Sequence, residues 1–297
     1  MRNFNENTIT DAVLERIANT PDTRLKQVCT SLVRHLHDFV RDVRLTDAEW
    51  SFAIDFLTRT GQKCDGSRQE FILLSDTLGI SILVDAINHG SGGSTETTVL
   101  GPVYVQNPPE YPLGADIRGG MEGDALYAEG RITSTDGKSL ANAFVDVWHS
   151  DDDGYYDVQH IDDVGGLSGR ARFRTDADGR YRFWSIKPAA YPIPYDGPVG
   201  DMLTAQKRHP WRPAHVHFMI EAPGYEKLAT HVFVNGDQYL DSDAVFGVKD
   251  TLIGNFVHHD AGMAPDGKVM AEPYYTFNFD FALAPAKTGA ETAPVMT

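Results

Sequence analysis

Apolar residues recur at every third or fourth position from Leu25 to Val43. This spacing predicts an amphipathic helix with one wide apolar face. Two partners suit that face: a helix of a second subunit, or the remainder of the chain. The sequence TDAE at Thr46–Glu49 matches a capping box and predicts the start of another helix. The stretch FILLSDTLGISILVDAINH at 71–89 is apolar on more than one side, which predicts a third helix that is buried on several faces.

From about Asn88 onward the pattern changes to short runs with a period of two, separated by turn residues. Such runs are typical of half-buried strands. DADG at Asp176–Gly179 predicts a hairpin turn between two of them. The runs are ALYAEGRIT, AFVDVWH, ARFRT, RYRFWSI, HVHFMIE, ATHVFV and YYTFNFDFAL.

Seven short strands with frequent turns favour an antiparallel β-sandwich. We therefore expect a mixed α+β protein in three parts. Residues 1–90 form a helical N-terminal region, residues 91–283 form a β-sandwich domain, and residues 284–297 form a disordered tail.

Composition narrows the function classes. The chain has 297 residues, a formal net charge of −16 and two cysteines. An acidic surface repels nucleic-acid phosphates and anionic lipid, which argues against those partners and favours a small-molecule substrate. No run approaches the roughly 20 apolar residues of a membrane span. The polar start of the chain and the scarcity of cysteine predict a cytoplasmic location.

The sequence RPAHVHFMI at 212–220 carries the first sign of chemistry. Alternate side chains of a strand share a face, so His215 and His217 point the same way. Two ligands are too few for a metal site. Copper or zinc would favour a third histidine, whereas a hard ferric ion would accept phenolate oxygen. The spacing by itself does not choose among these ions.

Four separated motifs then agree with one family. RPAHVHF, DVWHSDDDGYYD, YPIPYDGPVG and VLGPVYVQNPPEYPLGADI together resemble the intradiol ring-cleavage dioxygenases. The resemblance covers nearly the whole chain, including the helical N-terminal region of the branch that acts on catechol or hydroxyquinol. It implies a mononuclear non-haem Fe(III), held in the β-sandwich domain by Tyr156, Tyr191, His215 and His217. Tyr155 is the alternative to Tyr156.

The resemblance also implies the roles of other residues. Arg212 and Tyr191 are the expected catalytic residues: Arg212 stabilises charge on the substrate ring, and Tyr191 accepts a substrate proton. His231 stands where catechol enzymes often carry glutamine, and it is either a ligand or a residue beside the ligands. The expected substrate-binding residues are Leu73, Asp76, Gly101, Pro102, Val103, Ile193, Pro194, Arg212, Ala244 and Val245.

Asp76 favours one substrate within the family. Catechol enzymes commonly place an apolar residue or proline there, and a carboxylate could accept a hydrogen bond from an additional ring hydroxyl. We therefore expect hydroxyquinol (benzene-1,2,4-triol) and O2 as substrates, with 3-hydroxy-cis,cis-muconate and then maleylacetate as products. Local capping or pairing of Asp76 on its helix is the competing interpretation.

Two further functions stay open at this point. One is cleavage of catechol or a chlorocatechol, and the other is a non-catalytic β-sandwich binding module. The N-terminal helices predict a homodimer, and the resemblance raises the question of a phospholipid bound in a helix-lined channel.

Overall fold

The computed structural model describes residues 2–66, 68–90, 92–101, 103–159 and 166–287. By compactness the chain divides into two units, Met1–Gln62 and Lys63–Thr297. The division into residues 1–90, 91–283 and 284–297 remains a prediction, and most of the expected tail lies outside the described residues.

The first unit is helical. Thr46 and Glu49 form the expected capping box, in which the Glu49 carboxylate accepts hydrogen bonds from the Thr46 N–H and hydroxyl at 2.9 and 2.8 Å. The second helix begins after Asp22, whose carboxylate accepts a hydrogen bond from the Leu25 N–H at 2.7 Å. The helices are α1 (Ile9–Arg16), α2 (Thr23–Asp42) and α3 (Asp47–Gln62).

Helix α2 has no buried residue, although its apolar positions form one face. Seven large apolar side chains of this face are between 45% and 55% exposed. The seven residues are Leu25, Val28, Leu32, Leu36, Phe39, Val40 and Val43.

Within the described residues, no helix combines the length and apolar composition that a membrane crossing requires.

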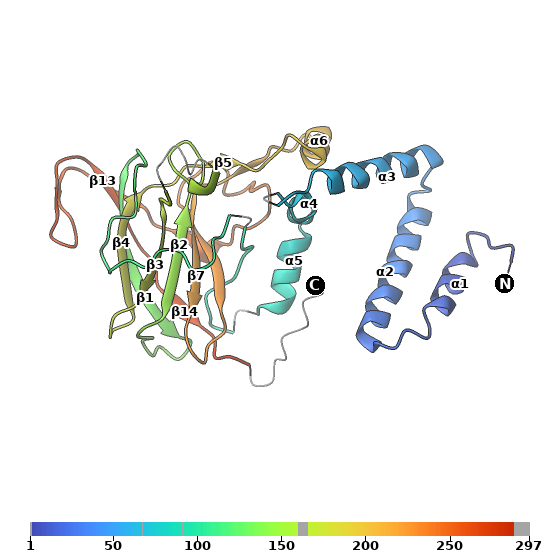
Figure 1. The fold of residues 1–297 in the computed structure, drawn as a ribbon, viewed down its shortest axis with the longest axis horizontal. Coiled ribbons are helices and arrows are strands. Elements are labelled where there is room, and N and C mark those ends of the chain that lie inside the picture. The colour runs from blue at the N-terminus through green and yellow to red at the C-terminus, as the bar shows by residue number, and fades with distance from the viewer. Residues whose placement is uncertain (1, 67, 91, 102, 160–165, 288–297) are drawn as a thin grey trace. The chain divides into compact units, whose positions relative to one another are not determined.

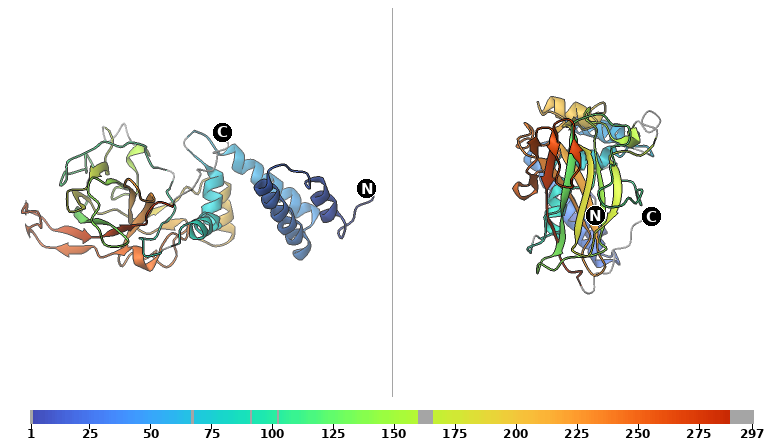
Figure 2. Two further views of the ribbon diagram at one scale, coloured as in Figure 1. Left: turned by 90° about the horizontal axis from the view of Figure 1, so that it is seen from below. Right: turned by 90° about the vertical axis from the view of Figure 1, so that its left-hand side faces the viewer.

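Among its described residues, the second unit contains three α-helices, α4 (Glu70–Thr77), α5 (Ile80–Asn88) and α6 (Pro198–Ala205), and Figure 2 shows α6 beside α4. The prediction of one buried helix over 71–89 is wrong. Gly79 separates α4 from α5 with a φ of 73°, a left-handed conformation that glycine adopts without strain. Because the chain turns there, the two halves cannot bury one continuous face. Large apolar side chains therefore stay about half exposed or more: Phe71, Ile72, Leu78, Ile80, Leu83, Val84 and Ile87.

Two five-stranded sheets form the β-sandwich (Figure 1), which confirms the expected fold class. In one sheet β1 lies between β13 and β14, β10 pairs with β13, and β4 also pairs with β1. The other sheet has the order β3-β2-β7-β8-β9. The strands of the first sheet are β1 (Ala125–Ser134), β4 (Arg180–Ile186), β10 (Val257–His259), β13 (Tyr274–Asn278) and β14 (Phe281–Leu283). Those of the second sheet are β2 (Phe144–His149), β3 (Arg170–Arg174), β7 (His215–Glu221), β8 (Leu228–Val234) and β9 (Ile253–Gly254). Two separate pairs are β5 (Tyr191–Pro192) with β6 (Trp211–Arg212), and β11 (Gly262–Met263) with β12 (Val269–Met270).

Two local expectations need correction. The turn at Asp176–Gly179 forms, but β3 and β4 lie in different sheets, so it connects the two layers and is not a hairpin. The run YYTFNFDFAL forms two strands, because the chain is displaced from the ladder opposite Gly130. A side chain at Gly130 would lie 1.9 Å from the Phe279 carbonyl oxygen, so only glycine permits that close approach. Both β13 and β14 run parallel to β1, whereas most other pairs are antiparallel.

The core between the sheets explains which face of β7 is left for function. Val216, Phe218 and Ile220 point inward and are fully buried with apolar residues of both sheets. Burial of such side chains contributes about 1.5 to 3 kcal/mol each. Because the strand alternates, His215 and His217 point to the outer face of the second sheet.

Candidate active site

The outer face of the second sheet carries a row of aromatic side chains on neighbouring strands. Trp148 on β2 lies opposite His217 on β7, and His217 lies opposite His231 on β8. The Trp148 indole stacks on the His217 ring, with 4.6 Å between centroids and 11° between planes. His215 adds a further imidazole two residues before His217. The strand register therefore gathers three buried imidazoles on one patch.

Tyr156 reaches this patch from the loop that follows β2. The next residue, Asp157, accepts two hydrogen bonds from Arg170 at 3.0 and 2.7 Å, and both side chains are buried. Displacing either partner would leave an uncompensated buried charge, so this pair holds the loop beside Tyr156 in place. Tyr156 is 3% exposed, whereas Tyr155 is 49% exposed. Of the two candidate tyrosines, the structure thus brings Tyr156 to the histidines.

Four donor atoms converge, with Tyr191 supplying the fourth from β5. The Tyr156 hydroxyl oxygen lies 3.0 Å from that of Tyr191 and 2.9 Å from His217 Nε2. His215 Nε2 lies 3.2 Å from His217 Nε2 and 3.4 Å from the Tyr191 oxygen. Ligands about 2.0 to 2.2 Å from a metal ion, at angles of about 90 to 110°, would be about 2.8 to 3.6 Å apart. The four contacts match the edges of such a coordination shell.

Both histidines are neutral, as metal ligands must be. Burial, and then the charge of Arg212, lowers the pKa of His215 to about 3. Burial and the adjacent imidazoles lower the pKa of His217 well below its usual value. His215 Nδ1 lies 2.7 Å from the Pro213 carbonyl oxygen, so Nδ1 carries the proton. His215 Nε2 therefore presents its lone pair to the other donors.

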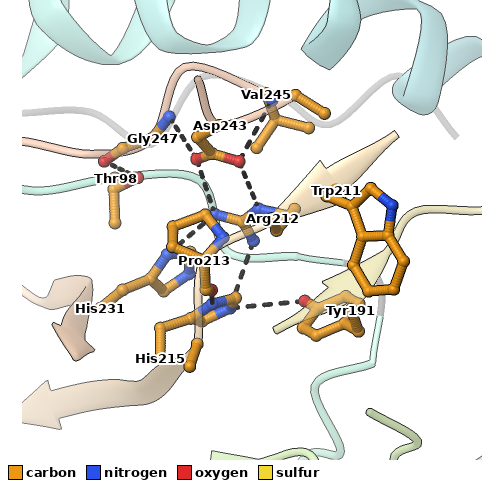
Figure 3. A network of polar contacts seen from close by, with 12 residues as sticks. Thr98, Tyr191, Trp211, Arg212, Pro213, His215, His231, Asp243, Val245 and Gly247 are labelled. Carbon is orange, nitrogen blue, oxygen red and sulfur yellow. Dashed lines mark hydrogen bonds and ion pairs between the residues drawn. The ribbon is translucent and has the colours of Figure 1, made fainter. Parts of the chain in front are cut away.

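Arg212 lies against the donor cluster in a carboxylate clamp (Figure 3). Its Nε and Nη2 donate to the two oxygens of Asp243 at 3.0 and 3.2 Å. Asp243 also accepts hydrogen bonds from the backbone N–H groups of Gly247 and Val245. Burial would raise the pKa of Asp243, but the Arg212 charge holds it below its usual value. Arg212 Nη1 lies 3.3 Å from His215 Nε2, so a positive charge is fixed beside the four donors.

Comparison with known proteins now assigns the family. A family model described as "Dioxygenase" matches residues 99–285, and one described as "Catechol dioxygenase N terminus" matches residues 22–95. The chain belongs to the intradiol ring-cleavage dioxygenases. A 6-chlorohydroxyquinol 1,2-dioxygenase of Cupriavidus pinatubonensis is 52% identical over 286 residues, which are 96% of this chain and 99% of that relative. A hydroxyquinol 1,2-dioxygenase of Corynebacterium glutamicum is 49% identical, over 94% of each chain.

A solved structure shows that the dioxygenase shares the fold of this family. The crystal structure of hydroxyquinol 1,2-dioxygenase from Pseudomonas putida DLL-E4 superposes with a TM-score of 0.89. It is 47% identical in sequence, and the match covers 95% of this chain and 99% of that one.

The predicted substrate wall of the dioxygenase is assembled in part. Four of its apolar residues meet in one cluster: Leu73 of α4, Ile193 after β5, and the adjacent pair Ala244 and Val245. Val103 packs in a different cluster, against Trp148 and Tyr156. Pro194 is exposed, and Pro102 lies outside the described residues.

Besides Arg212, two predicted substrate-binding residues remain, and both lie close to charged or proposed ligand groups. Gly101 has a φ of 79°, and a Cβ added there would lie 3.1 Å from His217 Cε1. Asp76 is buried, which raises the pKa of its carboxyl, while the Ser81 hydroxyl and the Arg212 charge oppose that rise. Ser81 lies on α5 and not on the helix of Asp76, so the competing interpretation, local capping or pairing of Asp76 on its own helix, stays a prediction.

Sequence reasoning did not find several residues of the site. Trp148 is within a quoted motif, but its stacking on His217 depends on which strands pair. Asp243 directly precedes Ala244 of the predicted wall. The sequence offered one signal for it, because a buried Arg212 needs a carboxylate as its partner. The Asp157–Arg170 pair carried no local signal, because 13 positions separate its partners.

The donor set fits a hard metal ion. Two imidazoles and two phenols meet at coordination distances, and the Nε2 lone pair of His215 is available. Burial, with the adjacent Tyr191 adding to it, raises the pKa of the Tyr156 hydroxyl well above its usual value. A phenolate at that depth needs a nearby cation, which a metal ion would supply.

Proposed function

We propose that this dioxygenase cleaves hydroxyquinol between its two ortho-hydroxylated carbons. Both atoms of O2 are inserted, giving 3-hydroxy-cis,cis-muconate, which tautomerises to maleylacetate. The observation that supports ring cleavage here is the convergence of two phenol oxygens and two imidazole nitrogens beside a fixed arginine.

The proposed cofactor is one non-haem Fe(III), held by Tyr156, Tyr191, His215 and His217. When bound, Fe(III) would withdraw electron density from the diol and make its ring reactive toward O2. The neutral histidines and the shared burial of the donors support this assignment.

Tyr191, as the tyrosinate that Fe(III) would hold, is proposed to accept a proton from a substrate hydroxyl at its phenolate oxygen and so become a neutral phenol. It is less buried than Tyr156 and lies on a strand of only two residues, so its ring can be displaced more easily. Tyr156 is fixed by its own burial and by the ion pair of the next residue, Asp157.

Arg212 is proposed to stabilise the negative charge that develops on the substrate ring. Its guanidinium stays charged at any working pH, and its clamp removes the need to reorient it during the reaction. Loss of one such fixed donor typically costs about 3 kcal/mol of barrier, or roughly two decades of rate.

Asp76 supports the triol as substrate. Its buried carboxyl has a raised pKa, which shows that the surroundings of Asp76 stabilise its charge poorly. A third ring hydroxyl would add a hydrogen bond to the one that Asp76 has with Ser81, whereas catechol has no such group. The names of the two curated relatives and of the crystal structure agree with this substrate class.

Oxygen uptake by the iron-loaded enzyme tests the proposal. Hydroxyquinol, 6-chlorohydroxyquinol, catechol and a chlorocatechol are compared for kcat/KM, before and after Asp76→Ala. Loss of a hydrogen bond to a charged group is worth about 1.5 to 3 kcal/mol, so turnover of hydroxyquinol should fall about 10- to 150-fold and that of catechol far less. The matched control is Asp85→Ala, because Asp85 is equally buried but pairs with His89 and Lys249.

The outcomes separate the alternatives. Equal losses for triol and diol in Asp76→Ala would remove the specificity argument and favour a catechol or chlorocatechol enzyme. A colourless protein that binds no iron and consumes no oxygen would instead support a binding module, because tyrosinate bound to Fe(III) absorbs visible light.

We also propose a homodimer formed through α2. The support is an apolar face on a helix that has no buried residue. Light scattering should give twice the monomer mass, and Leu32→Asp on that face should shift it to the monomer, whereas Arg34→Asp on the polar side should not. Binding of a phospholipid to the helices stays a prediction.

A further inference from the structure

His231 is the third imidazole of the patch and has no role in the four-donor cluster. It is fully buried, stacks on His215 at 4.6 Å between centroids, and meets His217 edge-on at 4.1 Å. A ligand atom from each of these three histidines lies within 4.8 Å of the others. By distance alone, His231 could therefore be a metal ligand. Whether it has a free lone pair for a metal ion depends on its hydrogen bonds.

The tautomer of His231 argues against ligation. Its Nδ1 lies 3.4 Å from Arg212 Nη2 (Figure 3). A guanidinium can only donate, so Nδ1 accepts and the ring proton is on Nε2. One nitrogen is occupied by Arg212 and the other carries a proton, which leaves no lone pair for a metal ion.

The hydrogen bonds of Arg212 show what His231 does instead. Asp243 takes the Nε–H and one Nη2–H, and His231 faces the other Nη2–H. Among the residues that the structure describes, the one hydrogen-bond contact of Nη1 is with His215 Nε2, whose lone pair a bound metal ion would occupy. With metal bound, Nη1 is therefore the part of the guanidinium that is available to the substrate.

Two contacts are needed to fix the orientation of Arg212 Nη1. A carboxylate along one edge still allows the guanidinium plane to tilt about that edge, whereas a contact on the remaining Nη2–H limits the tilt. Gly247 leaves the room that this arrangement needs, because a Cβ there would lie 3.0 Å from Arg212 Nη2. A neutral acceptor suits the position, since a second carboxylate would cancel more of the charge that Arg212 directs at the substrate.

We propose that His231 is a positioning residue, which accepts a hydrogen bond from Arg212 Nη2, thereby directs Nη1 at the substrate, and does not bind the metal ion. The inference deepens the proposed function and rests on it for the action of Arg212 on the diol.

A double-mutant cycle between His231 and Arg212 tests the proposal on the full-length, iron-loaded enzyme. His231→Met removes the acceptor at similar length, and His231→Asn restores one, because its amide oxygen lies two bonds from Cβ, as Nδ1 of histidine does. His231→Met should keep one iron per chain and the visible absorption band, while kcat and kcat/KM both fall about 10- to 100-fold. His231→Asn should recover activity to within about fivefold. In an Arg212→Met background, His231→Met should have no further effect, because the residue acts through the arginine.

A same-strand control separates this effect from general disturbance of β8. Thr230 is buried beside His231 on the opposite face and donates a hydrogen bond to the Glu96 carbonyl oxygen. Thr230→Val should lower the urea midpoint while leaving kcat/KM within about twofold. If His231→Met does not fold, the cycle is run with His231→Asn, which keeps an acceptor, and His231→Leu, which has none.

Defined results overturn the inference. Loss of iron or of the visible band in both His231→Met and His231→Asn would make His231 a ligand. Additive losses in the cycle would show that it does not act through Arg212. Failure of the unmodified enzyme to hold iron or consume oxygen would instead refute the proposed function. The same cycle can then still be measured through the urea midpoint of the metal-free protein. If the midpoint changes of the two single variants do not add up to that of the double variant, the contact between Arg212 and His231 is supported; if they add up, it is refuted.

Discussion

Gly101 offers a sharp test of how closely the chain confines its proposed metal ligands. Replacing it with alanine places a Cβ 3.1 Å from His217 Cε1, next to the Nε2 donor atom. Non-bonded carbon atoms normally lie about 3.5 to 4.0 Å apart, so the ring must shift by at least about 0.4 Å. Metal sites tolerate about 0.2 Å in ligand distance. We expect the iron affinity of Gly101→Ala to fall about 10- to 100-fold, a loss typical of disturbed ligand support.

Backbone strain must be separated from this contact. Gly101 has a φ of 79°, and an L-residue in the left-handed region is destabilised by about 1 to 2 kcal/mol. Gly137 is the matched control, because its φ is 85° and a Cβ there would meet nothing within 4 Å. Both alanine variants should lower Tm by a similar few degrees. Only Gly101→Ala should lose iron.

The assay is iron binding measured by competition with a chelator, followed through the visible absorption band. It compares the two alanine variants and the unmodified enzyme at one pH. If Gly101→Ala binds iron within threefold of Gly137→Ala, the loop does not confine His217 as argued.

Three further predictions follow from the site. Tyr156→Phe should lower iron affinity at least about tenfold and weaken the visible band, while Tyr155→Phe should change neither; equal effects on the spectrum would contradict the assignment. Asp157→Asn should lower the free energy of unfolding by about 3 to 5 kcal/mol in urea titrations, because it leaves the charge of Arg170 buried without a partner; a loss below about 1 kcal/mol would show that water reaches the pair. The metal-free protein should be most stable above about pH 6.5 and lose stability as pH falls, because each unfolded histidine binds a proton that the folded one, such as His215 with its pKa of about 3, does not. Each such histidine contributes up to about 1.4 kcal/mol per pH unit below 6.5, so urea midpoints that stay constant between pH 7 and 5 would refute the neutral cluster.

The local parts of this protein could be predicted from its sequence. The strand period places His215 and His217 on one face whatever the strand packs against, and the capping box at Thr46–Glu49 depends only on residues three apart. The resemblance of spaced motifs implied Tyr191 and Arg212, which the structure places opposite each other on β5 and β6. These features need no knowledge of distant partners.

Tertiary structure alone decided how those pieces meet. Which sheet a strand joins depends on partners far along the chain, so the turn at Asp176–Gly179 could link two layers instead of closing a hairpin. The same holds for the row of Trp148, His217 and His231, which exists only once β2, β7 and β8 pair in their observed register. The choice between adjacent tyrosines followed from a buried ion pair that holds their loop. Strand period and capping depend on neighbouring residues, whereas pairing register and the burial of charge depend on the whole fold.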